Sequence, residues 1–211
     1  MGYYPVFLEM KQRRCIVIGG GAVAERKVGG LLAVGACVTV ISPTITERLQ
    51  NLLTQGAIRH VAREYEAGDL AAYELAFVAT DNVDTNRVVF HEARSRKVWV
   101  NSADDPDRCD FILPAVIRRG DLMIAVSTGG GSPAVSRAIR EELESYFTKD
   151  YEILVGMAAE VREELRQRSI VPDYQTWRKA LSGDLRQLIM GGELGRAKSL
   201  LLKQLGTTSC E

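Results

Sequence analysis

Four aspartates gather in one short stretch, N-S-A-D-D-P-D-R-C-D-F, as Asp104, Asp105, Asp107 and Asp110. They follow an apolar run at residues 97–101 that predicts a strand. In an open parallel sheet, ligands bind beyond the carboxyl ends of the strands. A carboxylate there could remove a proton from a substrate or draw a metal ion toward nitrogen ligands. For Asp107 and Asp110 we favour solvated acids in an Asp-Pro turn, and for Asp104 both interpretations stay open.

A second candidate for chemistry is the glycine turn in C-I-V-I-G-G-G-A-V-A-E-R-K, residues 15–27. Gly19, Gly21 and Ala24 fit the pattern G-x-G-x-x-[GA] between an expected strand and an expected helix. In this pattern the first glycine allows a tight turn and the second lets a pyrophosphate approach the backbone. The anion then lies at the helix N-terminus, where free amides and the helix dipole favour it. The turn therefore predicts dinucleotide binding, against the alternative of a merely structural turn.

The residues after the second expected strand bear on the choice of cofactor. This strand ends in Ser42-Pro43-Thr44, where an acidic residue normally holds the adenosine ribose. Ser42 could still hydrogen-bond the ribose, and no Arg or Lys follows at once to receive a 2′-phosphate, so NAD is favoured over NADP. The cofactor-binding candidates are Gly19, Gly20, Gly21, Ala22, Val23, Ser42, Pro43, Thr44, Thr80 and Asp81.

The stretch S-T-G-G-G-S-P at residues 127–133 is a second candidate anion loop. Ser132 is a good N-cap and Pro133 suits the first helical position, while the glycines expose amides. By itself the stretch predicts a well-capped helix. Beside an anionic ligand, with Arg137 and Arg140 on the following helix, it becomes a carboxylate clamp. The substrate-binding candidates are Asn101, Ser127, Thr128, Gly129, Gly130, Ser132 and Arg137.

Alternating elements must position these residues. Apolar runs that predict strands occupy residues 14–18, 37–42, 58–62, 75–80, 97–101 and 122–128. Helices are expected between them at residues 22–34, 46–54 and 84–95. This alternation predicts an α/β fold with an open parallel sheet and helices on both faces.

The pattern changes after a long expected helix at residues 133–147, because only helical segments follow. We expect three parts: a nucleotide-binding domain at residues 1–112, a small central dimerisation segment at 113–149, and an all-helical C-terminal domain at 150–211. Several apolar residues of the central segment are too many for a small sheet-plus-helix unit to bury alone, which predicts a homodimer. They are Leu113, Val116, Ile117, Val135, Ile139 and Leu143.

Composition and charge argue against several classes of function. Lys and Arg number 27 and Asp and Glu also 27, so the balanced charge argues against a nucleic-acid partner or a polybasic membrane contact. No apolar run approaches a membrane span, and the N-terminus lacks the features of a secretory signal. The four cysteines lack zinc spacing, so no metal site is expected and a reducing cytoplasm is the expected compartment. His60 and His91 have no catalytic partner in view and are interpreted as structural.

Taken together, the motifs G-G-G-A-V-A-E-R-K, V-A-T-D-N-V-D-T-N-R-V-V, N-S-A-D-D and S-T-G-G-G-S-P, with the helical tail, resemble a known family. This is the precorrin-2 dehydrogenase/sirohydrochlorin ferrochelatase family of short siroheme synthases. The resemblance covers essentially the whole chain, and the combination of motifs is far more specific than any one of them.

The resemblance implies a Rossmann-type domain, a central segment that interlocks two subunits, and a helical C-terminal domain. It implies an enzyme that oxidises precorrin-2 to sirohydrochlorin with NAD, and some members also insert ferrous iron to give siroheme. The family's essential aspartate falls on Asp104. Its cofactor contacts fall on the glycine turn with Ala22 and Val23, and on Pro43 and Thr44. Two alternatives stay open: an NAD-binding regulatory or redox-sensing module, and an interaction protein that has lost the site.

Overall fold

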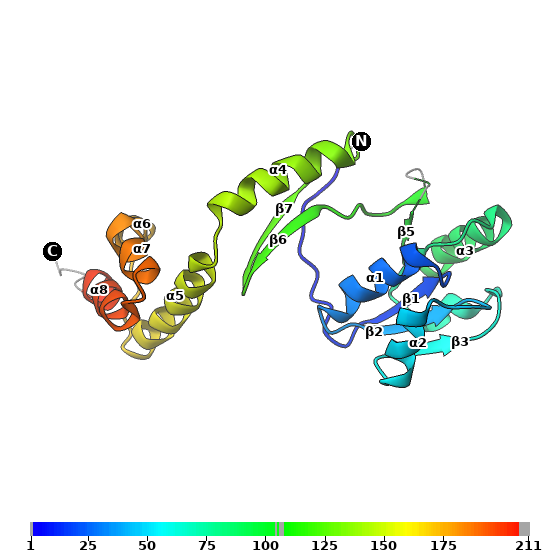
Figure 1. The fold of residues 1–211 in the computed structure, drawn as a ribbon, viewed down its shortest axis with the longest axis horizontal. Coiled ribbons are helices and arrows are strands. Elements are labelled where there is room, and N and C mark those ends of the chain that lie inside the picture. The colour runs from blue at the N-terminus through cyan, green and yellow to red at the C-terminus, as the bar shows by residue number, and fades with distance from the viewer. Residues whose placement is uncertain (1, 104, 106–107, 207–211) are drawn as a thin grey trace. The chain divides into compact units, whose positions relative to one another are not determined.

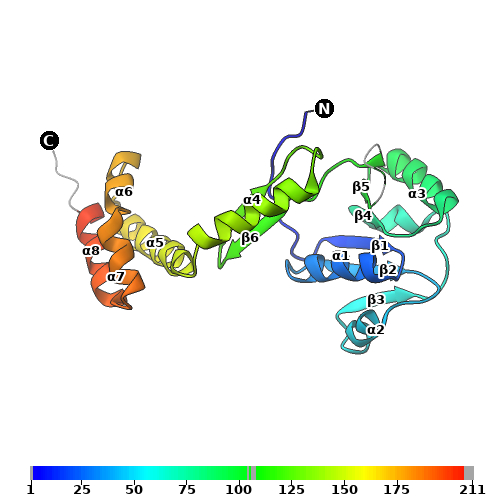
Figure 2. The ribbon, with the colours of Figure 1, turned by 45° about the horizontal axis from the view of Figure 1, so that its top comes forward.

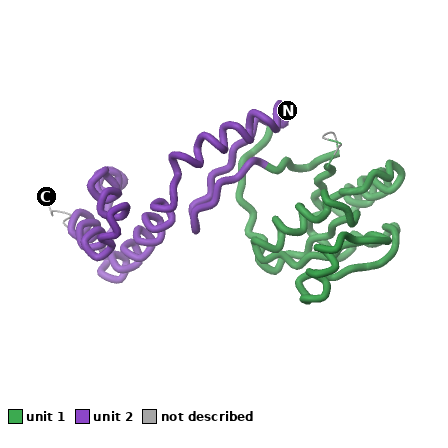
Figure 3. The backbone as a smooth tube through the Cα atoms, in the orientation of Figure 1, with its two compact units in different colours: residues 1–113 green, residues 114–211 purple. Residues whose placement is uncertain are grey.

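The computed structural model describes residues 2–103, 105 and 108–206 of the 211-residue chain. The chain divides into two units, residues 1–113 and residues 114–211 (Figure 3).

The first unit is built on short apolar runs that form a fully parallel five-stranded sheet in the order β3-β2-β1-β4-β5 (Figure 1). The central strands are buried almost throughout, as expected for strands covered on both faces. The strand order changes direction between β1 and β4, and such a switch point is where open sheets bind ligands. The strands are β1 (Arg14–Ile18), β2 (Cys37–Ile41), β3 (Ile58–Val61), β4 (Leu75–Val78) and β5 (Trp99–Ser102).

Helices cover both faces of this sheet (Figure 2). On one face, Val28 of α1 and Leu49 of α2 are fully buried against β1, β2 and β4. On the other face, Leu70 of η1 and Val89 of α3 are equally buried. This is the predicted Rossmann-type α/β architecture, which is confirmed. The connecting helices are α1 (Ala22–Leu32), α2 (Glu47–Thr54), the short 3-10 helix η1 (Asp69–Ala72) and α3 (Val83–Arg96).

The second unit begins with a hairpin. The expectation that residues 122–128 continue the parallel series is wrong, because β7 (Leu122–Val126) pairs antiparallel with β6 (Ala115–Arg119) in a separate two-stranded sheet. The physical reason is the two-residue connection Gly120-Asp121. Gly120 has φ +56°, the left-handed region that a glycine opening a tight hairpin turn readily adopts. No strand was expected at β6.

One face of this hairpin is covered by α4 (Pro133–Tyr146), and Ile117 of β6 is buried there. Four helices follow and form a third hydrophobic core, in which Val161, Leu185 and Leu201 are fully buried. They are α5 (Asp150–Gln167), α6 (Tyr174–Ala180), α7 (Gly183–Met190) and α8 (Leu194–Gly206). Within the part of the chain that the structure describes, none of the helices is both long and apolar enough to cross a membrane.

Candidate functional site

The first two glycines of the glycine turn (residues 19–21) are required by the chain's own packing. Gly19 has φ +113°, and a Cβ there would lie 2.1 Å from the carbonyl oxygen of Ala79, which follows β4. A Cβ at Gly20 would lie 2.0 Å from the carbonyl oxygen of Thr44. Real Cβ atoms do not approach backbone so closely, so any side chain at either position must displace a neighbouring segment.

Gly21 differs, because a Cβ there would meet no atom of the described chain within 4 Å. It forms the N-cap of α1 with extended backbone at φ −85°, and no side chain caps this end of the helix. The exposed Gly21 and Ala22 therefore present the first amides of α1 to solvent at the carboxyl edge of β1. This geometry fits a pyrophosphate, which needs close approach to the backbone and amide donors.

The loop after β2 packs against the turn. Ser42 is buried, and its carbonyl oxygen accepts a hydrogen bond from Nε2 of His60 at 2.9 Å. Pro43 and Thr44 follow and are exposed. The amide of Thr46 donates to the carbonyl oxygen of Gly20 at 3.0 Å, which fixes the loop onto the turn.

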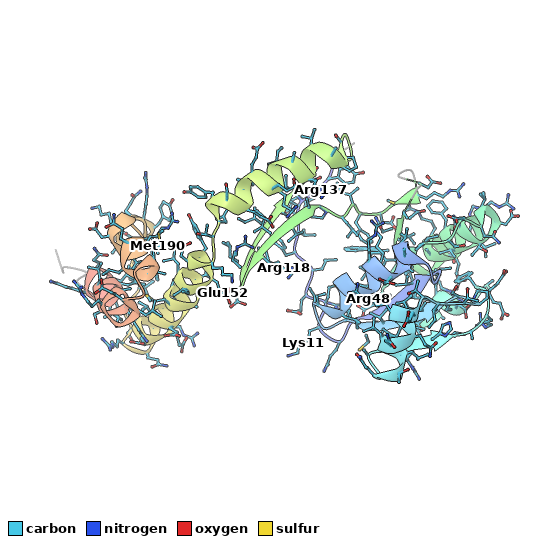
Figure 4. All side chains as sticks on the ribbon, in the orientation of Figure 1. Lys11, Arg48, Arg118, Arg137, Glu152 and Met190 are labelled. Atoms are coloured by element: carbon cyan, nitrogen blue, oxygen red, sulfur yellow. The ribbon has the colours of Figure 1, made fainter. Side chains whose placement is uncertain are left out.

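Glu25 of α1 fixes the same loop, although the sequence analysis did not single it out. Its carboxylate accepts a hydrogen bond from the hydroxyl of Thr46 at 2.8 Å and pairs with Arg48 at 3.4 Å. Arg48 lies at the start of α2 (Figure 4). The cation nearest in sequence to this loop is thus held by an acidic residue of α1.

The candidates after β4 lie at the beginning of α3. The hydroxyl of Thr80 accepts a hydrogen bond from the amide of Asn82, the N-cap of α3, and Asp81 is exposed. Nδ2 of Asn86 donates to the carbonyl oxygen of Thr80 at 3.0 Å. Oδ1 of Asn86 is buried and has no hydrogen-bond partner among the described residues. A buried amide oxygen without a donor therefore lies near Thr80.

The residues on either side of the aspartate-rich stretch are paired with each other. We call residues 103–108 the aspartate loop, and the paired residues 100–102 and 109–111 its neck. Val100 and Asp110 exchange two hydrogen bonds of 2.8 and 2.9 Å, one of them to the Asp110 carboxylate. The Ser102 amide donates to Sγ of Cys109 at 3.2 Å, and burial raises the pKa of this thiol. Asn101 joins the neck through Nδ2, which donates to the carbonyl oxygen of Phe111 at 3.0 Å.

The individual aspartates have different surroundings. Asp104 and Asp107 lie outside the described residues. Asp105 pairs with Arg108 at 3.2 Å, so its carboxylate already has a cation. Asp110 is exposed, as expected for this acid, but besides its bonds to Val100 its carboxylate pairs with Arg94 of α3 at 2.8 Å.

Lys27 of α1 was also missed by the sequence analysis. Its Nζ donates to Oδ1 of Asn101 at 2.9 Å and lies 5.7 Å from the ring centroid of Phe77 on β4. Burial lowers the pKa of this amine from its ordinary value. The helix that begins at the glycine turn is therefore joined to the neck of the aspartate loop.

The second glycine loop lies in the other unit and is closed by its own hydrogen bonds. The hydroxyl of Ser127 accepts from the Gly129 amide at 3.1 Å, and that of Thr128 accepts from the Ser132 amide at 2.9 Å. Gly129 and Gly130 both have positive φ, at 64° and 87°. Ser132 caps α4 as predicted, with its hydroxyl accepting from the Val135 amide at 3.3 Å.

The arginines of α4 are occupied by acids of their own helix. Arg137 (Figure 4) pairs with Glu141 at 2.8 Å, and Arg140 pairs with Glu141 and Glu144. The Arg137 side chain is 76% exposed, and exposed pairs of this kind contribute little free energy. An anionic ligand can therefore compete for Arg137.

Comparison with known proteins decides the family. A model described as "Putative NAD(P)-binding" matches residues 6–115, more than half of the chain. The chain belongs to this NAD(P)-binding family. A second model, described as "Sirohaem biosynthesis protein central", matches residues 119–146.

The chain is similar to longer proteins named siroheme synthase. It is 38% identical to that of Nitrosomonas europaea over 208 residues and 38% identical to that of Thioalkalivibrio sulfidiphilus over 211. These alignments cover 97% and 98% of this chain, but only 44% and 43% of the relatives. The chain thus spans less than half the length of these curated relatives.

A solved structure described as SirC, precorrin-2 dehydrogenase, is similar in both fold and length. The TM-score is 0.77 at 27% sequence identity, over 93% of this chain and 99% of that one. The resemblance inferred from the sequence motifs is confirmed by these matches.

Proposed function

We propose that this protein oxidises precorrin-2 to sirohydrochlorin with NAD as the hydride acceptor. The observation that carries the proposal is Gly21. No packing contact within the described chain requires a glycine at this position, since a Cβ there would meet no atom within 4 Å. Gly21 also lies at the uncapped start of α1, beside the switch point of the sheet. The near full-length likeness to a structure named precorrin-2 dehydrogenase supports the choice of substrate.

In this proposal the glycine turn binds the cofactor and the aspartate loop supplies the base. The amides of α1 hold the pyrophosphate, and the exposed Pro43 and Thr44 flank the adenosine. NAD, when bound, supplies the carbon that accepts the hydride. Asp104 takes up a proton as the hydride leaves, so the substrate loses two electrons and two protons: a hydride to NAD and a proton to the carboxylate. The neighbouring Asp105 is less suited as the base because its carboxylate is already paired with Arg108 at 3.2 Å.

The substrate is a macrocycle edged with carboxylates. We assign its recognition to the second glycine loop, whose glycines expose amides, and to the exposed cation of Arg137. The substrate-binding role of Ser127, Thr128 and Ser132 is then to fix the loop, because their hydroxyls bond to loop and helix backbone.

Turnover of matched aspartate variants tests the proposal. A positioned base contributes about 10²–10⁴ in rate, so Asp104→Ala should lose that order of NADH formation from precorrin-2 while its NAD affinity is retained. Asp105→Ala should lose much less. Absorbance at the NADH band with enzymatically made precorrin-2 measures both. Near-normal turnover in Asp104→Ala removes this residue from the mechanism.

The same assay separates the alternative of an NAD-binding regulatory or redox-sensing module. Such a module binds NAD but forms no NADH with precorrin-2. Replacing NAD with NADP in the assay tests the cofactor preference, for which we expect NAD.

The relatives' name, siroheme synthase, favours a second reaction at the same site. We propose that the protein also inserts ferrous iron, as a substrate, into sirohydrochlorin. Anaerobic addition of Fe²⁺ to sirohydrochlorin with and without the enzyme tests this by the change in the tetrapyrrole spectrum. Equal rates with and without enzyme exclude chelation by this chain.

We further propose that residues 113–149 form the dimerisation segment of a homodimer. Ile117 is buried within the unit against α4, but Leu113, Val135 and Ile139 are 51%, 48% and 38% exposed. The hairpin face that carries Val116 and Met123 lies opposite the one that α4 covers.

We place the reaction in a reducing cytoplasm, which suits the free thiols among the described cysteines.

A further inference from the structure

The neck of the aspartate loop is held from outside by one lysine. Within the neck, Val100 is bonded to Asp110 and Ser102 to Cys109. Asn101 lies between these pairs, is 6% exposed, and uses Nδ2 for the carbonyl oxygen of Phe111. Its remaining polar atom, Oδ1, accepts the hydrogen bond of 2.9 Å from Lys27. Both polar atoms of Asn101 therefore have partners inside the protein, which favours a supporting role over direct contact with the substrate.

Lys27 reaches Asn101 across the sheet. It projects from α1, passes over the ring of Phe77 on β4 and ends at the edge strand β5. The helix that presents amides at the glycine turn is thus connected, through one side chain, to the base of the loop that carries Asp104.

Burying the charged amine of Lys27 costs the folded protein free energy. Burial lowers the pKa of its amine, because the surroundings disfavour the charged form. Among the described residues it forms no ion pair with a carboxylate, and Asn101 is its hydrogen-bond partner. An apolar side chain of similar length would fill the same space against Phe77 without this cost. The polar end therefore serves a purpose other than packing.

We propose that Lys27 is a positioning residue that fixes the neck of the aspartate loop relative to the glycine turn, acting through Asn101. The inference rests on the proposed dehydrogenase function, since it concerns the placement of Asp104 against the bound cofactor. It predicts that Lys27 acts on turnover and not on NAD affinity.

Kinetics of Lys27→Met test the role in catalysis. Methionine keeps the length of the stem and removes the donor, so we expect kcat to fall about 10- to 100-fold, as for a small misplacement of a catalytic group. The NAD dissociation constant, measured by calorimetry, should stay within about twofold of wild type. Arg26→Met is the matched control, because Arg26 is the exposed neighbouring cation on α1 and its loss should leave kcat unchanged.

The thiol of Cys109 reports on the neck without any turnover. It is half-buried and bonded to the Ser102 amide, so an uncharged maleimide should modify it slowly in the wild type. If the neck opens more often in Lys27→Met, Cys109 should be modified about tenfold faster or more in this variant. Peptide mass spectrometry measures the rate. The change in charge alone works the other way, because the Lys27 ammonium lowers the pKa of Cys109 and its removal disfavours the thiolate. Arg26→Met should leave the rate unchanged.

A double-mutant cycle identifies the path. If Lys27 acts through Asn101, then Lys27→Met in an Asn101→Ala background should cost little further kcat. Additive losses overturn the path through Asn101. An unchanged Cys109 rate together with normal kcat in Lys27→Met overturns the whole inference, and so does an equal loss of NAD affinity and kcat. If the wild type fails to oxidise precorrin-2, the proposed function falls, while the Cys109 rates still decide whether Lys27 holds the neck.

Discussion

At the scale of single residues, Gly20 and Gly21 are neighbours that lack a side chain for different reasons. Gly20 makes room for the carbonyl oxygen of Thr44, whereas Gly21 faces open space. We expect Gly21→Val to abolish NAD binding, measured by calorimetry, with a melting temperature close to wild type. Gly30→Val is the control, since Gly30 lies on the same helix with nothing within 4 Å and should keep full NAD affinity. Undiminished affinity in folded Gly21→Val contradicts the assignment of the pyrophosphate site.

Glu92 of α3 is a residue whose effect should depend on pH. Its half-buried carboxylate accepts bonds from the Tyr65 hydroxyl at 2.5 Å, from the amides of Gly68 and Leu70, and from Arg96. Burial alone would raise the pKa of Glu92, but these hydrogen bonds outweigh it and lower the pKa below its ordinary value. Its charged form is thus favoured in the folded state.

A carboxylate with a depressed folded-state pKa stabilises the fold above its unfolded pKa, near 4.3, and loses this contribution as the pH falls through the folded value. We expect Glu92→Gln to lower the free energy of unfolding at pH 7 by about 2 kcal/mol, because one charged acceptor of several donors is lost. Urea unfolding at a series of pH values measures this. The difference from wild type should shrink below about pH 4, and a difference independent of pH contradicts the explanation.

At the scale of elements, the parallel strands could be predicted because each is an apolar run bounded by turn residues. The run at residues 122–128 looked the same, and only its partner distinguishes it. β6 ends in Arg118-Arg119, so its pattern was too polar at one end to be recognised. The turn at Gly120 was a signal that could have revealed the hairpin, since glycine between two short runs favours a tight connection.

The residues of the candidate site also differ in whether the sequence could predict them. The glycine turn and the Ser132 cap are local patterns and could be predicted. Glu25 and Lys27 could not, because their partners Thr46 and Asn101 lie 21 and 74 residues further along the chain. A charged residue on a helix surface gives no sign in the sequence that it will meet a distant loop. Such contacts are set by how the sheet brings the elements together.

At the scale of the whole molecule, the exposed apolar residues of α4 predict self-association. We expect light scattering to give a mass near twice the single-chain value of 23.3 kDa at micromolar concentration. Ile139→Glu should shift the mass toward the monomer, because a charge in an apolar interface loses its hydration. Val171→Glu is the control, at a position 86% exposed on the helical domain, and should leave the mass unchanged. A wild-type mass near 23 kDa contradicts the dimer.

The three glycines of the turn should also behave differently in a saturation library. Variants sorted once for cellular abundance and once for retention on an immobilised nucleotide give two scores for each position. Substitutions at Gly19 and Gly20 collide with the backbone at Ala79 and Thr44, so they should vanish from both sorted pools. Substitutions at Gly21 meet no protein atom and should persist in the abundance pool while they disappear from the retention pool. The difference between the two scores would then map the surface where the ligand, and not the chain, dictates the sequence.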